Sequence, residues 1–118
     1  MKSSVLRDKS FEFSLMVVEL CRHLRAIKTE YILCNQLLRS GTAIGALVRE
    51  AEFAQSKADF INKLSIALKE ANETSYWIDI LLQSNCIDET MQTNVRFLLT
   101  EIIKMLVASI NTAKGNKK

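Results

Sequence analysis

Apolar residues recur every three or four positions along four long segments of this chain, which is the spacing of amphipathic α-helices. In two of these segments, residues 37–51 and 59–73, apolar side chains fall on more than the one face that a monomer needs to bury. Surplus apolar surface on a helix is usually covered by another subunit. The pattern therefore predicts an all-α protein that assembles with copies of itself.

Capping residues divide this pattern into four helices. Side chains of serine, threonine and aspartate accept hydrogen bonds from the first N–H groups of a helix, so they mark its start. The expected caps are Ser10, Thr29, Ser56 and Asp88, and the expected helix ends lie near Lys28, Ala54, Leu82 and Lys114. We thus expect a tail at residues 1–9, a bundle at 10–113 and a basic tail at 114–118. Short connections make neighbouring helices antiparallel, which predicts an up-down-up-down four-helix bundle.

One face of each helix supplies the predicted core. In the third helix the expected core residues are Phe60, Leu64, Ala67, Leu68, Ala71, Ser75, Ile78 and Leu82. In the second helix the seam includes Gly41 and is flanked by a second glycine one turn later, Gly45. Each costs about 1 kcal/mol against alanine in a helix, so we expect a neighbouring helix backbone to approach closely there.

A second set of positions lies outside these seams and predicts subunit contacts. It includes a tryptophan on a nominally solvent-facing side, the residue type most typical of interfaces. The candidates are Phe11, Leu15, Val18, Arg39, Glu50, Ile66, Glu73, Trp77, Ile80 and Phe97. Arg39 and Glu50 lie three turns apart on one face, with small residues between them. That face is either an ordinary solvated surface or a contact whose charges fix the register of a neighbour.

Composition narrows the setting of the protein. The 118 residues include three cysteines, an odd number without metal-ligand spacing, so a disulfide framework is not expected. No segment has the length of a membrane span, and the first residues lack the apolar stretch of a signal peptide. Buried free thiols and the absence of these segments together predict a cytoplasmic protein without a membrane partner.

Residues for catalysis, cofactors or metals do not stand out. His23 is the one histidine, and its neighbour Cys21 is too close in sequence to face it on a helix. A di-iron centre in a four-helix bundle needs two Glu-x-x-His pairs, and the chain contains none. Phosphate loops and nucleophile motifs are also missing. We therefore expect no enzymatic activity and no cofactor.

Basic residues offer a different kind of site. The net charge is +3, and the candidates for nucleic-acid binding are Arg22, Arg25, Lys28, Arg49, Lys57 and Lys63. In an antiparallel bundle they form two patches at opposite ends. Each patch alone also fits a solvated helix surface. In a symmetric oligomer each becomes a ring, which suits the phosphate backbone of RNA or DNA in a sequence-independent way.

Four stretches together resemble a known family. They are residues 36–46 (QLLRSGTAIGA), 49–52, 56–60 and 69–77 (KEANETSYW). This pattern resembles the four-helix-bundle proteins encoded in intervening sequences of bacterial 23S ribosomal RNA genes. That family is in turn similar to the accessory variability determinant proteins of diversity-generating retroelements. The resemblance implies a homopentamer without established enzymatic activity, and relatives that bind nucleic acid and partner a reverse transcriptase.

The sequence therefore predicts a non-enzymatic homo-oligomer, expected to be a pentamer, that binds RNA or DNA through basic residues. The alternative is a scaffold that recruits a partner protein, such as a reverse transcriptase, without touching nucleic acid.

Overall fold

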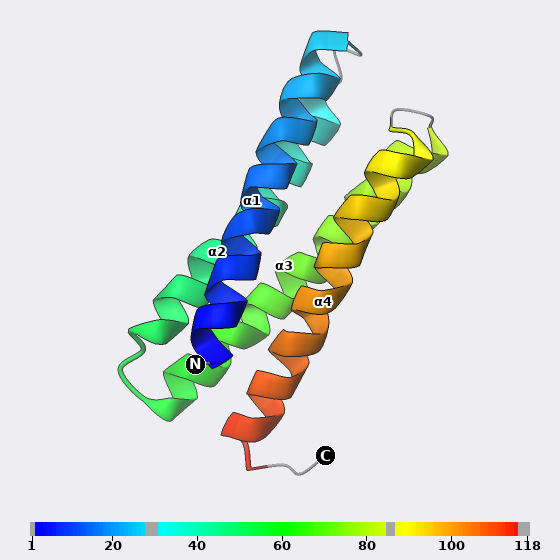
Figure 1. Cartoon of the computed structure of the whole chain (residues 1–118). Helices are drawn as coiled ribbons and strands as arrows, with labels where there is room; N and C mark the ends of the chain where they lie inside the picture. Colours follow the sequence, from blue (N-terminus) through cyan, green and yellow to red (C-terminus); the bar gives the residue numbers. More distant parts are fainter. Residues whose placement is uncertain (1, 28–30, 85–86, 116–118) are drawn as a thin grey trace.

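The protein, in a computed structural model, is described over residues 2–27, 31–84 and 87–115. These residues form four helices and no strand: α1 (Lys2–Ile27), α2 (Tyr31–Glu52), α3 (Lys57–Gln83) and α4 (Glu89–Ala113). Successive helices run in opposite directions along a body of 46 × 26 × 20 Å (Figure 1). The predicted all-α fold with four helices is confirmed.

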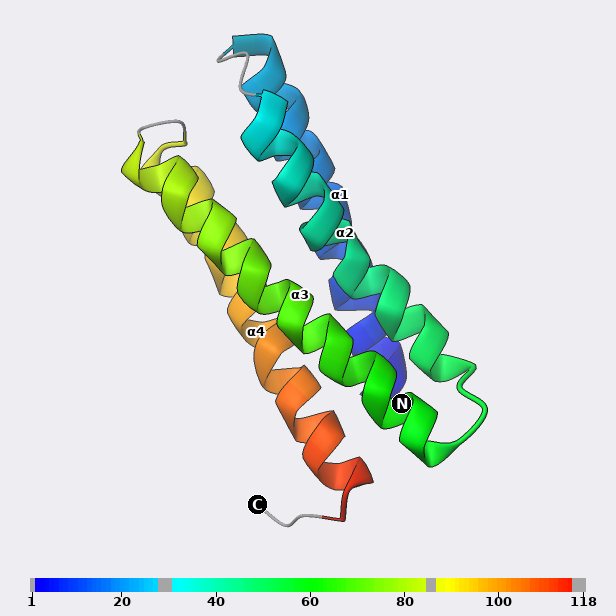
Figure 2. The same ribbon diagram turned by 180° about the vertical axis from the view of Figure 1, so that it is seen from behind.

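The bundle has two ends that differ in what they carry. The turn end holds the α2–α3 turn at residues 53–56, the start of α1 and the end of α4 (Figure 1). The tip end holds the end of α1, the start of α2, the end of α3 and the start of α4. Seen from behind, α2 and α3 lie next to each other at the turn end and diverge toward the tip end (Figure 2). Each helix packs against two others, α1 and α3 each contacting both α2 and α4.

Helix α1 begins at Lys2, so the predicted start at Ser10 is wrong. Ser10 is fully buried inside the helix, and its hydroxyl donates a hydrogen bond to the Arg7 carbonyl at 3.0 Å. Leu6 is only 3% exposed and belongs to the core. It lies seven residues before Phe13, which places both side chains on one helix face. Residues 2–9 therefore extend the helix instead of forming a tail, because Leu6 gives them an apolar anchor.

The other described helix boundaries follow the predicted caps. The Ser56 hydroxyl accepts a hydrogen bond from the Asp59 N–H at 3.0 Å, and the Asp88 carboxylate caps α4 in the same way at 2.9 Å. Gly115, just after α4, has a φ of 82°, the left-handed conformation that ends many helices. The cap predicted at Thr29 lies outside the described residues.

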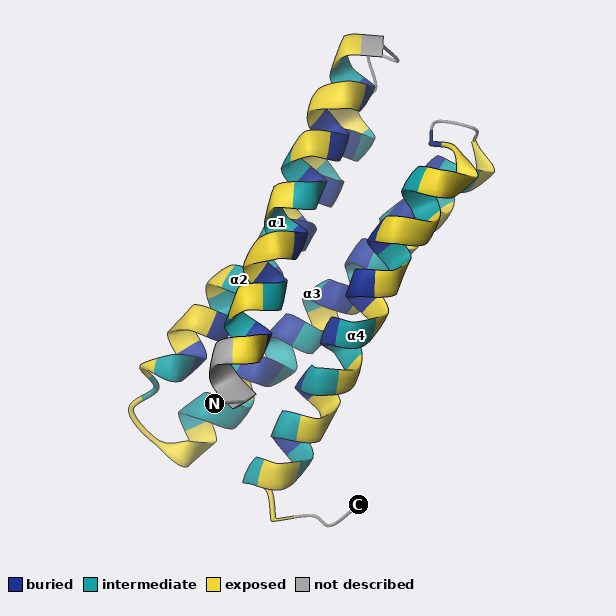
Figure 3. Cartoon of the chain, in the orientation of Figure 1, coloured by how far each residue is buried: buried dark blue, intermediate teal, exposed yellow. Residues whose placement is uncertain are grey.

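All four helices contribute buried apolar side chains to one core (Figure 3). The predicted seam of α3 is partly wrong, because Leu81 and Thr74 are fully buried although neither was assigned to the core. Four residues that were assigned to it, Phe60, Leu68, Ser75 and Leu82, are only half-buried. Helix α3 packs on both α2 and α4, so its buried arc is set by two neighbours and is not centred on the most apolar stripe.

The two helical glycines lie against α1, as the predicted close approach requires. A Cβ atom at Gly41 would meet the Val17 side chain at 2.9 Å, closer than real Cβ contacts. A Cβ atom at Gly45 would lie 3.3 Å from the Ser10 carbonyl oxygen, a backbone atom. Glycine therefore lets α1 and α2 approach each other more closely than larger residues would.

A buried pair of hydroxyl groups joins α2 to α3. Thr74 Oγ1 lies 2.9 Å from Ser40 Oγ, and both residues are 0% exposed. The Thr74 hydroxyl also lies 2.7 Å from the Glu70 carbonyl oxygen, to which it donates. The Ser40 hydroxyl then donates to Thr74, so both buried groups are satisfied. This pairing works at only one register of the two helices.

The cysteines fit the predicted buried thiols as far as they are described. Cys21 is 3% exposed and Cys34 is 0% exposed, while Cys86 lies outside the described residues. The Cys21 thiol donates to the Cys34 carbonyl oxygen across α1 and α2 at 3.4 Å. Burial, followed by the proximity of Cys34, raises the pKa of the Cys21 thiol to about 12. Cys21 therefore stays protonated at neutral pH and is a poor nucleophile.

Candidate functional site

The five candidate cations that the structure describes lie at opposite ends of the bundle, as expected for an antiparallel arrangement. Arg22 and Arg25 are in the last turns of α1 at the tip end; we call them the tip-end cations. Arg49, Lys57 and Lys63 flank the α2–α3 turn; we call them the turn-end cations. Lys28, the sixth candidate, lies outside the described residues.

The tip-end cations are engaged in local contacts. Arg22 forms an ion pair with Glu19 at 2.9 Å, one turn earlier on α1. The Arg25 guanidinium donates to the side-chain oxygen of Asn35 on α2. A nucleic-acid phosphate would have to compete with both partners, so this end is the weaker of the two candidate sites.

The turn-end cations differ from one another in their partners. Lys63 lies 3.5 Å from Glu50 and 3.9 Å from Asp59. Arg49 and Lys57 have no acidic partner among the described residues, and both are exposed. The Arg49 guanidinium instead lies over the ring of Phe11, 5.4 Å from its centroid, in a cation–π contact.

The acidic side chains at the same end have partners of their own. Glu50 pairs with Lys63, and Glu52 lies 3.6 Å from Arg7. The Asp59 carboxylate accepts a hydrogen bond from the Gln55 N–H at 3.2 Å. Because these acids are occupied by other groups, the positive charges of Arg49 and Lys57 remain available to a phosphate there.

The apolar candidates for subunit contacts divide into exposed and half-buried side chains. Phe11 and Leu15 on α1 are 49% and 55% exposed, and Phe97 on α4 is 66% exposed. Val18, Ile66, Trp77 and Ile80 are half-buried within the chain. The ring of Trp77 packs edge-on against Tyr76 at 5.2 Å between centroids. Among the predicted contact residues, the exposed apolar side chains are thus on α1 and α4.

The charged candidates for subunit contacts find partners within the chain. Arg39 on α2 lies 3.3 Å from Glu70 and also pairs with Glu73, both on α3. The Trp77 indole N–H donates to the same Glu73 carboxylate at 3.0 Å. Glu50 reaches Lys63 on α3. The face predicted from the Arg39–Glu50 spacing is therefore the edge where α2 meets α3.

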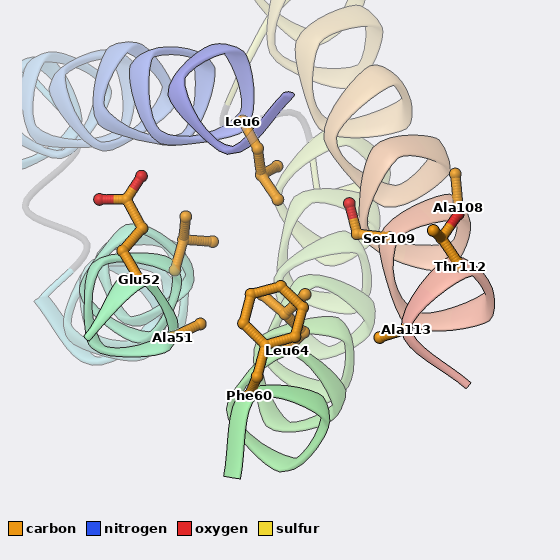
Figure 4. Close-up of a pocket in the computed structure, with 10 residues that line it drawn as sticks. Leu6, Ala51, Glu52, Phe60, Leu64, Ala108, Ser109, Thr112 and Ala113 are labelled. Atoms are coloured by element: carbon orange, nitrogen blue, oxygen red, sulfur yellow. The ribbon is translucent and has the colours of Figure 1, made fainter. Parts of the chain in front are cut away.

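A hollow of about 560 Å³ opens at the turn end between all four helices (Figure 4). Phe60 and Leu64 enter it from α3, Leu6 from α1, and Ser109 and Ala113 line it from α4. Its wall is mostly apolar. The hollow exists because the α4 residues that line it are small and leave space that larger side chains would fill. It lacks a converging set of polar or titratable groups that would indicate a catalytic pocket.

The described residues contain no group of three or more His, Cys, Asp or Glu side chains that could hold a metal ion. Within the same described residues, none of the helices combines the length and apolar character needed to cross a membrane.

Phe53 is a residue that the sequence reasoning missed. It directly follows α2 and is 85% exposed, more than any other large apolar side chain described. A signal existed in the sequence, because a phenylalanine falls where the helical pattern resets and lies four residues from both Arg49 and Lys57. Helical periodicity assigns no face to a turn residue, so the pattern alone did not select it.

The fold and its surfaces define a small helical-bundle protein with exposed apolar and cationic side chains on its outside. The chain belongs to the 23S rRNA-intervening sequence protein family, whose match covers residues 2–108. A solved crystal structure is also similar, described as a protein with unknown function from the S23 ribosomal protein family of Bacteroides thetaiotaomicron VPI-5482. It is 49% identical, the match covers 94% of this chain and 99% of that chain, and the TM-score is 0.92. Comparison with curated proteins found no match.

Proposed function

We propose that this protein is a non-enzymatic, cytoplasmic homo-oligomer that binds RNA or DNA without sequence specificity through the turn-end cations. One observation carries the nucleic-acid part of the proposal: Arg49 and Lys57 are exposed at one end of the bundle without an acidic partner in the described residues, while the nearby acids are paired elsewhere. Sequence-independent binding needs only such cations, because the phosphate backbone is the same in every sequence.

Exposed apolar side chains support the assembly. Burying a large apolar side chain contributes about 1.5–3 kcal/mol, so three of them left in water favour a subunit contact. Leu15 on α1 is 55% exposed, whereas Phe97 lies on the α1–α4 side near Lys9 and Met105. Two unlike patches suit a head-to-tail contact, and such a contact generates a ring when the rotation between successive subunits closes. We propose five subunits, following the family resemblance.

Light scattering on the purified chain tests the assembly. The proposal expects a mass near five times 13.4 kDa at micromolar concentration. Leu15→Lys and Phe97→Lys should each lower that mass, because a charge would have to be buried in the contact. Asn94→Lys, an exposed polar position on α4, is the matched control and should leave the mass unchanged. A wild-type monomer of 13.4 kDa would contradict the assembly.

Fluorescence anisotropy with labelled RNA and DNA tests the binding. Affinity should fall steeply as salt rises, because bound cations displace counterions from the phosphates. The double variant Arg49→Glu with Lys57→Glu should weaken binding about 100-fold at low salt, and Arg22→Glu with Arg25→Glu should weaken it less. Absence of wild-type binding at low salt would overturn this function. Capture of a partner protein after nuclease treatment would then favour the scaffold alternative.

A further inference from the structure

The side chain of Phe53 lies in water at the turn end of the bundle. Its 85% exposure compares with 49% for Phe11 and 66% for Phe97. An isolated apolar ring so far outside the core contributes nothing to folding that a smaller residue would not. Its neighbours in the turn, Ala54, Gln55 and Ser56, are small or polar, so the turn itself adds no second large apolar side chain.

The backbone that carries Phe53 is held in place from both sides. The Phe53 N–H donates to the Glu50 carbonyl oxygen and the Ala54 N–H to the Ala51 carbonyl oxygen, each at 3.1 Å. Ser56 then caps α3. A ring fixed between two helix ends loses little conformational entropy when a flat ligand stacks on it, since only two side-chain torsions are free.

Two exposed cations without an acidic partner among the described residues lie close to Phe53 along the chain. Arg49 lies one helical turn before Phe53, and Lys57 begins α3 just after the turn. Arg49 is further ordered by its contact with the Phe11 ring at 5.4 Å. An exposed aromatic residue with a cation four residues before it and another four residues after it suits a nucleotide strand, in which each base is accompanied by phosphates on either side.

We propose that Phe53 stacks on an unpaired base of single-stranded RNA or DNA while Arg49 and Lys57 contact the adjacent phosphates. This inference rests on the proposed nucleic-acid binding and narrows its ligand to single strands. In a duplex the faces of the bases are already stacked on one another, so only the two cations would find partners there. An anionic membrane fits less well, because interfacial anchoring takes a larger apolar face than one phenylalanine supplies.

Anisotropy titrations of the full-length wild type and Phe53→Ala test the inference. The ligands are labelled twelve-nucleotide oligo(U), oligo(dT) and a DNA duplex of the same length. Phe53→Ala should weaken single-strand binding about tenfold and leave duplex binding unchanged, since one stacked base is lost. Phe53→Trp should keep the affinity. Ile32→Ala removes a side chain that is 75% exposed at the tip end, and this control should have no effect.

A second variant separates stacking from charge. Arg49→Gln with Lys57→Gln should weaken binding to single strand and duplex alike, and reduce the salt dependence by about one unit per cation.

The outcomes distinguish this inference from the function on which it rests. If the wild type binds neither the single strands nor the duplex, both the proposed function and this inference are overturned. Wild-type binding that is equal for single strand and duplex, with Phe53→Ala unchanged, would overturn the stacking role and leave nucleic-acid binding intact. If Phe53→Ala abolishes binding to vesicles of phosphatidylglycerol and leaves oligonucleotide affinity unchanged, the stacking role is overturned and Phe53 contacts a membrane instead. Circular dichroism and light scattering should show all variants folded and assembled as the wild type.

Discussion

The two sides of α2 are held by different physical means. Toward α1, the middle of the contact depends on shape, with Gly41 and Gly45 leaving room for the Val17 side chain and the Ser10 backbone. Polar pairs on this side, Arg7 with Glu52 and Arg25 with Asn35, lie nearer the helix ends. Toward α3, it depends on polar pairs: Ser40 with Thr74 inside, and Arg39 with glutamates at the edge. A shape-dependent contact is sensitive to added volume, whereas a polar contact is sensitive to the loss of either partner.

The largest expected effect follows from adding volume on the α1 side. Gly41→Leu should lower the free energy of unfolding by about 3 kcal/mol, because Val17 is fully buried and has few alternative rotamers. Urea unfolding at fixed protein concentration measures this loss. Adding Val17→Ala to the same chain should recover part of it by making room. Gly45→Ala should cost less than Gly41→Leu, because its added Cβ would lie 3.3 Å from the Ser10 carbonyl oxygen, a tight contact but a small group, and because alanine favours a helix over glycine by about 1 kcal/mol. An unchanged urea midpoint for Gly41→Leu would show that the close approach is dispensable.

Removing one hydroxyl on the α3 side should have the next largest effect. Thr74→Val keeps the volume but leaves the buried Ser40 hydroxyl without its acceptor, which should cost about 2 kcal/mol by urea unfolding. Adding Ser40→Ala should restore part of the loss, because neither partner then remains unsatisfied. If the double variant is as unstable as the sum of the two single variants, the hydroxyl pair does not act as a unit.

The smallest effect is a pH dependence on the α1 side. The pKa of Cys21 is raised to about 12 in the folded chain, so above the ordinary thiol pKa of 9.0 only the unfolded chain releases this proton. The unfolded state therefore binds fewer protons, and the free energy of unfolding should fall by up to about 1.4 kcal/mol per pH unit over that range. Urea unfolding at pH 8 and pH 10 measures the fall. It should be smaller in Cys21→Ala, and an equal fall in both would assign it to other groups.

Local chemistry explains what could be predicted from the sequence. The caps at Ser56 and Asp88 involve contacts over three residues, so the sequence alone determines them. The close approach at Gly41 and Gly45 was also predictable. Glycine in a helix interior destabilises the helix, so two of them one turn apart indicate a compensating contact with a neighbouring helix.

Features that depend on the relative placement of helices were not predictable in the same way. Thr74 and Leu81 are buried because α3 is rotated between two neighbours, and periodicity does not give that rotation. The pairing of Arg25 with Asn35 joins two helices, so it is invisible along either one. For this reason the sequence alone does not distinguish the two basic ends. In the structure they differ, because only the turn end has two exposed cations that lack an acidic partner among the described residues.

The early start of α1 has a consequence for proteolysis. Arg7 and Lys9 are trypsin sites by sequence, yet both lie inside a regular helix and form ion pairs with Glu52 and Glu101 on neighbouring helices. A protease must unwind several residues to cut there, and doing so would withdraw Leu6 from the wall of the hollow. Resistance of these two bonds to digestion thus reports on how firmly the first turns of the chain are docked.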